Sequence, residues 1–145
     1  MVKYFNKLYE RNKDYINKPN LDTISKDSGL IQKDNTVEYD LTLSPIIIVS
    51  KITVNYPSRL RIYSTSTARI DDRNRDTETY PTESLPILMD ALFVENDLTL
   101  PLQLGRVWVN LDTPQSSKFY VSIENRGDSD FDINLKMQLS TINQP

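Results

Sequence analysis

Apolar residues occupy every second position along much of this sequence, and this alternation limits the available folds more than any other feature. The pattern is clearest in residues 37–43, 119–123 and 131–139. Successive side chains of a β-strand point to opposite sides, so a period of two gives each segment one face for a core and one for solvent. The sequence therefore predicts an all-β domain between residues 36 and 141.

Seven or eight short strands are expected, with turn-forming residues between them. They cover residues 36–43, 46–54, 59–65, 90–95, 98–104, 106–111, 118–125 and 130–141. Many short antiparallel strands are typical of a β-sandwich, in which two sheets bury their inner faces against each other. The predicted fold class is an antiparallel β-sandwich.

The alternation also predicts which side chains face inward. One face of residues 46–54 is predicted to hold Ile48, Ser50, Ile52 and Val54. In residues 59–65, Leu60 and Ile62 are expected inside, and the outward positions are those of Arg59, Arg61 and Tyr63. Pro101 cannot donate a backbone hydrogen bond, which predicts an edge position for residues 98–104.

The last two strands are predicted to form a hairpin. The sequence Arg126-Gly127-Asp128-Ser129 between them suits a tight turn, and Gly127 is expected to supply a positive φ. On the last strand, the side chains expected to share the inner face are Phe131, Ile133, Leu135 and Met137.

A short helix and a loop are expected between the predicted strands 59–65 and 90–95. Ser66 or Thr67 is placed to cap a helical turn over residues 68–73. Residues 74–86 are mostly polar, which predicts a surface loop.

The first 35 residues are rich in Lys and Asn and do not alternate. Apolar side chains at helical spacing predict an amphipathic helix from about Lys3 to Asn17, with the stripe Tyr4, Phe5, Leu8 and Tyr15. Residues 20–35 are expected to be an extended linker. The sequence thus predicts two parts, an arm over residues 1–35 and a sandwich over residues 36–145.

An isolated helix of this length is marginal in water, so its stripe has to pack on something. The stripe either covers the chain's own domain or docks on a neighbouring subunit. In the second case Tyr4, Phe5, Leu8 and Tyr15 are partner-binding residues.

Composition removes several classes of function. The chain has no His and no Cys, which excludes triad catalysis of the usual kinds and the usual zinc and haem ligands. Its three glycines form no phosphate-binding loop, and its net charge of −3 disfavours a nucleic-acid partner. The apolar runs are too short for a membrane-spanning helix. We expect no enzyme activity, no cofactor, no metal and no membrane partner.

Charged residues are dense after the third predicted strand. Arg69, Asp72, Arg73 and Arg75 lie within seven positions, and Asp72 is three residues from both Arg69 and Arg75. That spacing favours ion pairs on a helical turn. The pairs either fix a solvated corner, each contributing about 0–1 kcal/mol, or contact a neighbouring subunit.

The last predicted turn contains two features that each allow a functional and a structural interpretation. Asp128, Asp130 and Asp132 are possible calcium ligands, but their spacing lacks the elements of a known calcium loop, and a charged strand face that discourages aggregation is favoured. The Arg-Gly-Asp sequence at 126–128 resembles an adhesion motif, but it is also ordinary turn chemistry, which we favour.

Trp108 is the single tryptophan, and it is expected in the core. The alternative is a sugar-binding platform in which it is joined by Tyr56, Tyr63, Tyr80 and Tyr120.

Residues 59–75, RLRIYSTSTARIDDRNR, follow a pattern of two arginines alternating with apolar residues, a Tyr, small residues and Ala-Arg-x-x-Asp-x-x-Arg, with Asp72 as the matching acid. This pattern resembles small β-domains of tailed bacteriophages, which also carry a closing segment like residues 119–139. The two stretches cover less than a third of the chain.

The resemblance implies a virion structural protein of the tail, baseplate or fibre, with other virion proteins as partners, and it implies no catalytic residue. A homo-oligomer is a further possible partner arrangement. The alternatives are a capsid decoration protein, a carbohydrate-binding module and, last, a small glycan hydrolase.

Overall fold

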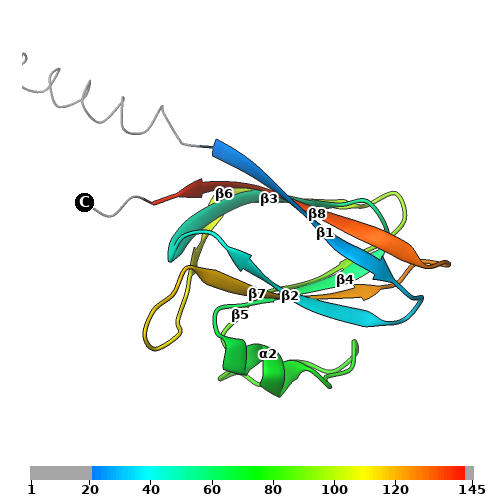
Figure 1. Cartoon of the computed structure of the whole chain (residues 1–145), viewed down its shortest axis with the longest axis horizontal. Helices are drawn as coiled ribbons and strands as arrows, with labels where there is room; N and C mark the ends of the chain where they lie inside the picture. Colours follow the sequence, from blue (N-terminus) through cyan, green and yellow to red (C-terminus); the bar gives the residue numbers. More distant parts are fainter. Residues whose placement is uncertain (1–20, 143–145) are drawn as a thin grey trace, which may run out of the picture.

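The computed structural model describes residues 21–142, which form eight strands and one short helix (Figure 1). The elements are β1 Leu21–Ile31, β2 Thr36–Thr42, β3 Ile46–Val54, β4 Ser58–Tyr63, α2 Ser66–Asp72, β5 Ile87–Phe93, β6 Thr99–Val109, β7 Lys118–Asn125 and β8 Phe131–Thr141. The predicted helix near the N-terminus, with Tyr4, Phe5, Leu8 and Tyr15, lies outside the described residues.

The strands form two antiparallel sheets of four, with the orders β1-β8-β3-β6 and β2-β7-β4-β5. Only β4 and β5 are consecutive strands of one sheet, and every other connection between described strands crosses from one sheet to the other. This strand order is that of an eight-stranded jelly roll. The predicted antiparallel β-sandwich is confirmed.

The core lies between the two sheets and is built from the inward positions of the alternating strands. Its fully buried side chains include Ile47, Ile52, Leu60, Ile62, Phe119, Ile123, Ile133, Leu135, Met137 and Leu139. Trp108 is 3 % exposed and lies 6.3 Å from Phe119, ring centre to ring centre. Trp108 is therefore a core residue, as predicted for the single tryptophan of a small sandwich.

The prediction of a linker over residues 20–35 is wrong, because β1 occupies residues 21–31. This strand pairs with β8 from Leu21 opposite Ser140 to Ile31 opposite Phe131. Most of its side chains are exposed and only Ile31 is buried, so an alternating apolar pattern is missing. The sandwich therefore begins before residue 36. The predicted boundary between residues 35 and 36 would separate the edge strand β1 from the rest of its sheet.

The predicted hairpin of the last two strands is also wrong. β7 lies in one sheet and β8 in the other, so residues 126–130 bridge the two layers. Gly127 does not have a positive φ. A Cβ at this position would lie 2.5 Å from Cε2 of Phe131, so the glycine is required by close contact rather than by backbone conformation.

Substitution of Gly127 by alanine should therefore lower stability by about 1–3 kcal/mol, the usual cost of overpacking. The new methyl group would push Phe131 from its stack on Tyr56, where the rings lie 3.8 Å apart and nearly parallel. Urea unfolding measures the change, with the exposed Ser129→Ala as the control. Equal midpoints for both variants would contradict this explanation.

Strand β3 departs from the predicted face because it contains a bulge. The register with both neighbours shifts between Val49 and Lys51, which leaves Ser50 out of the ladder. The buried positions are consequently Ile47 and Val49 before the bulge, and Ile52 and Val54 after it. Only the second half of the predicted inward face is correct.

Strand β6 joins the two segments predicted as 98–104 and 106–111, and it lies at the edge of its sheet as Pro101 indicates. Its ladder is interrupted where Leu104 and Gly105 both have positive φ. The side chain of Leu104 is consequently directed to solvent and fully exposed.

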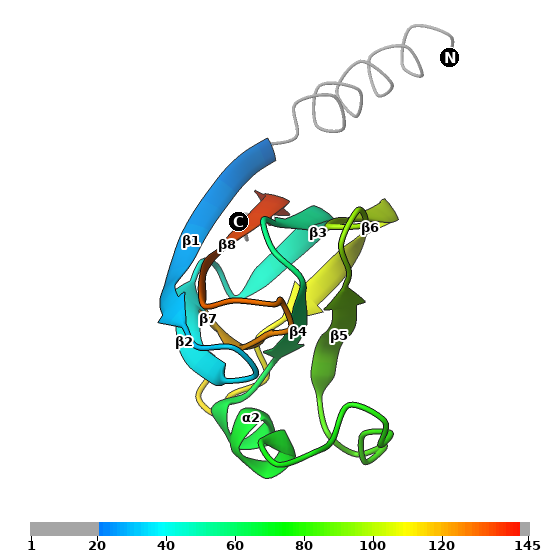
Figure 2. The same ribbon diagram turned by 90° about the vertical axis from the view of Figure 1, so that its right-hand side faces the viewer.

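The helix α2 begins at Ser66, two residues before the helical turn predicted over residues 68–73. Its N-cap is Thr65, whose hydroxyl accepts a hydrogen bond from the backbone N–H of Ala68 at 3.0 Å, and not Ser66 or Thr67. Figure 1 shows α2 outside the β2-β7-β4-β5 sheet, and Figure 2 shows the loop that continues from it towards β5.

Candidate functional site

The outer face of β4 is covered, although its alternation predicts exposure. Leu60 and Ile62 face the core as expected. Arg59, Arg61 and Tyr63 point to the other side, yet they are 3 %, 4 % and 0 % exposed. Helix α2 and the loop after it cover these side chains, so the space between them and the sheet is a second, charged interior.

Asp72, at the end of α2, is the centre of this interior. Its carboxylate accepts a hydrogen bond from the Tyr63 hydroxyl at 2.6 Å. Arg75 donates to both carboxylate oxygens, at 2.6 and 2.9 Å, and Nη1 of Arg61 lies 3.6 Å away. Asp72 is 2 % exposed, so these are charge-assisted bonds in a region with little water.

A second carboxylate, Asp90 on β5, continues the network. Arg59 donates to both of its oxygens at 3.1 Å, and Nη2 of Arg75 donates to it at 2.6 Å. Arg75 therefore joins Asp72 to Asp90. Arg59 also donates to the Thr77 hydroxyl at 3.2 Å, which ties the loop to the sheet.

The remaining arginines attach α2 to the edge strand β2. Arg69 donates to the Tyr39 carbonyl at 3.0 Å and to the Asp40 carboxylate at 2.9 Å. Arg73 binds Glu38 through two bonds of 2.8 and 2.9 Å. We call this set of residues the α2 network. Its members are Glu38, Asp40, Arg59, Arg61, Tyr63, Arg69, Asp72, Arg73, Arg75 and Asp90.

The four charged residues predicted from the sequence thus lie together, and each contacts other residues of the chain. Asp72 and Arg75 are buried, Arg69 is mostly buried, and half of the Arg73 side chain is exposed. Their predicted role in binding a partner stays a prediction. Sequence reasoning missed Arg59, Arg61 and Asp90, because local alternation does not report that α2 and the loop after it cover the outer face of β4.

The same network sets the pKa of its acids. Burial by itself would raise the pKa of Asp72, but hydrogen bonds from Arg75 and Tyr63 outweigh it and hold that pKa below the usual value. Burial would also raise the pKa of Asp90, but hydrogen bonds from Arg59 and Arg75 outweigh burial and hold that pKa below its usual value. Burial raises the pKa of Tyr63, and the bond to Asp72 raises it further.

Stability should accordingly fall at both ends of the pH scale. A carboxyl whose pKa is lower in the folded state adds stability above its unfolded pKa of about 4, and this is lost as pH falls through the folded value. A tyrosine whose pKa is raised adds stability that is lost as pH rises above about 10. Urea midpoints should be nearly level between these limits, and a midpoint unchanged at pH 3 would contradict the role of Asp72.

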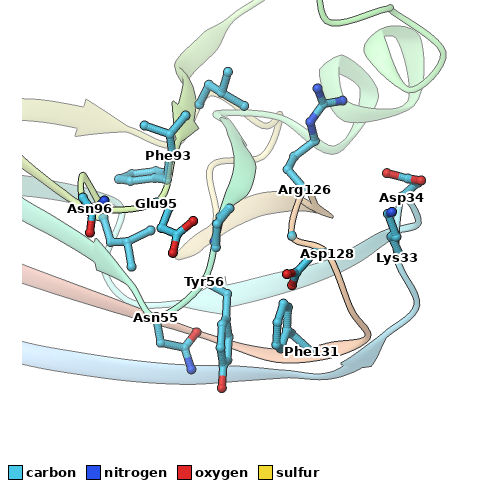
Figure 3. A pocket seen from close by; sticks show the side chains of 15 residues that line it. Lys33, Asp34, Asn55, Tyr56, Phe93, Glu95, Asn96, Arg126, Asp128 and Phe131 are labelled. Atoms are coloured by element: carbon cyan, nitrogen blue, oxygen red, sulfur yellow. The ribbon is translucent and has the colours of Figure 1, made fainter.

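A second candidate site is a groove at one end of the sandwich (Figure 3). It is open to solvent, has a volume of about 940 Å³, and is lined by residues from four loops. Tyr56 and Phe131 stack at its floor, and the labelled polar side chains around them include Glu95 and Asp128.

The other sequence candidates are placed as follows. Trp108, Tyr63 and Tyr120 are buried, so the predicted sugar platform does not form, and Tyr80 is 93 % exposed in a different loop. Asp130 and Asp132 accept hydrogen bonds from the backbone N–H groups of Lys33 and Gly29. Within residues 21–142 no group of three or more acids is arranged to hold a metal ion.

Comparison with known proteins finds no matching family model and no matching curated protein. None of the helices in the described part of the chain has the length and apolar character needed to cross a membrane.

Proposed function

We propose that this chain is a non-enzymatic structural protein of a virion, of the tail, baseplate or fibre, that binds other proteins of the particle. The proposal rests on the contacts made by residues 59–75, the stretch that resembles phage β-domains. Its arginines and Asp72 bind one another and the neighbouring strands. Chemistry of this kind fixes a cap on a sheet, and it uses Asp72 and the arginines of this stretch in contacts within the chain.

The positions of the strand ends support an arm that anchors the domain. β1 begins at Leu21 and β8 ends at Thr141, and Leu21 pairs with Ser140, so both lie at one end of the sandwich (Figure 1). The groove lies at the opposite end. A chain held through residues 1–20 would therefore display the loops that form the groove.

The test is incorporation into particles that lack the protein. Full-length chain should be taken up, and a form without residues 1–20, which keeps β1, should be taken up far less. The exposed Tyr80→Ala is the matched control and should behave like the unmodified chain. No uptake of the full-length chain would contradict a virion role, and equal uptake of the shortened form would contradict anchoring by the arm.

A capsid decoration protein is the alternative location for the same class of function. Cryo-EM of particles that carry the labelled chain separates the two, because density on the tail supports the proposal and density on the capsid supports the alternative.

A further inference from the structure

The groove is formed where four loops meet. The jelly-roll order brings the β1–β2, β3–β4, β5–β6 and β7–β8 connections to the same end of the sandwich (Figure 1). Each connection contributes to the groove, through Lys33, Tyr56, Glu95 and Asp128 respectively (Figure 3). Loops held by a rigid scaffold are a common place for binding residues.

The β1–β2, β3–β4 and β7–β8 loops are fixed to one another before any ligand arrives. The side-chain amide of Asn125, which is fully buried, donates to the carbonyls of Ile31 and Ser129 at 2.8 Å and accepts from the N–H of Gly127. The N–H of Arg126 donates to the Pro57 carbonyl at 3.0 Å. A preformed groove loses less conformational entropy on binding than a flexible one.

The lining combines an aromatic floor with exposed polar groups. Tyr56 and Phe131 are both partly exposed and stack on each other at 3.8 Å, so the pair contributes aromatic surface to the lining. Glu95, Asn96 and Asp128 are exposed at its rim. Sugar hydroxyls both donate and accept hydrogen bonds, and carboxylates and amides are suitable partners for them. The C–H face of a sugar ring packs on an aromatic surface.

The charges and the backbone argue against two other kinds of ligand. Two cationic side chains, Lys33 and Arg126, face three anionic ones, Asp34, Glu95 and Asp128, whereas a phosphate or polyanion needs a cationic excess. A peptide that adds a strand needs free backbone groups. The N–H groups of Asp34, Asp97 and Arg126 are already bonded within the chain.

We propose that this groove binds a neutral carbohydrate, with Tyr56 as the stacking platform and with Glu95 and Asp128 as hydroxyl partners. The proposal is independent of the virion role, because it uses only residues of the groove. It also differs from the platform around Trp108, which is buried in the core.

The test uses the full-length chain on an array of neutral oligosaccharides built from glucose, galactose, mannose and N-acetylhexosamines, followed by calorimetric titration of any glycan that binds. Tyr56→Ala and Asp128→Ala should each weaken binding by at least about tenfold. Their matched controls, Tyr80→Ala and Asp76→Ala, change exposed residues outside the groove and should leave affinity unchanged. Asp128→Ala alters an exposed loop position, so it remains informative if Tyr56→Ala unfolds.

Absence of binding to every neutral glycan by folded protein would overturn the proposal. Equal losses in the groove variants and their controls would overturn it too. If groove variants lose incorporation into particles and no glycan binds, the groove is a protein interface. Binding is measured on the isolated chain and incorporation on particles, so failure of this proposal and failure of the virion role are distinguished.

Discussion

Deletion of residues 1–35 should abolish the cooperative unfolding transition that deletion of residues 1–20 preserves. The longer deletion removes β1 and the buried Ile31, and it strips β8 of one of its two neighbouring strands. The exposed edge would then belong to a strand whose inner face holds Leu135, Met137 and Leu139. Such an apolar strand with unpaired backbone groups is prone to aggregate.

Near-UV circular dichroism and urea unfolding of the two shortened forms measure this difference. The form without residues 1–20 is the matched control, because it retains every described strand. Equal midpoints for the two forms would mean that β1 adds nothing to the stability of the sandwich, and they would restore the interpretation of residues 20–35 as a linker.

Periodicity predicted the fold class because it reports which strands have one buried face. It located β2, β3, β4, β7 and β8 within a few residues. Of the inward set predicted on β8, Ile133, Leu135 and Met137 are buried, whereas Phe131 is partly exposed at the edge of the core. It could not locate β1, which is held mainly by its ladder to β8 and buries little apolar surface. An edge strand of this kind has no alternating pattern to detect.

Periodicity also says nothing about which strands pair. The inner faces of β7 and β8 have the same alternation whether the strands are neighbours in one sheet or face each other across the core. The structure has the second arrangement. The turn residues 126–129 suit either connection, which is why the hairpin was a reasonable but wrong prediction.

The candidate sites likewise combine contacts that local spacing predicts with contacts between distant residues that it does not predict. The Asp72–Arg75 pair follows from a spacing of three and was predictable. Asp90 reaches Arg75 only because β5 pairs with β4, and such a contact between distant residues has no local signal. The groove is assembled from four loops, so the sequence marks Tyr56 and Asp128 only as parts of other candidate sites and gives no sign that they lie together.

Substitution of Asp72 by alanine should lower the free energy of unfolding by about 3–5 kcal/mol, the usual cost of leaving a buried charge unpaired. Arg61 and Arg75 are 4 % and 8 % exposed in their side chains, and both would lose this carboxylate. Tyr63 would lose its hydrogen-bond acceptor as well. Urea unfolding measures the loss, and Asp71→Ala, an exposed acid next in sequence, should change stability by less than about 0.5 kcal/mol.

The double variant Asp72→Ala with Arg75→Met decides whether unpaired charge is the cause. The Arg75→Met substitution removes one of the two cations that Asp72→Ala leaves unpaired. The double variant should therefore lose less free energy of unfolding than the sum of the losses in the two single variants. A strictly additive result would mean that Asp72 and Arg75 stabilise the fold independently of each other. The loss in Asp72→Ala would then come from its contacts with Tyr63 and Arg61, and the charge that Arg75 is left with would not be its cause.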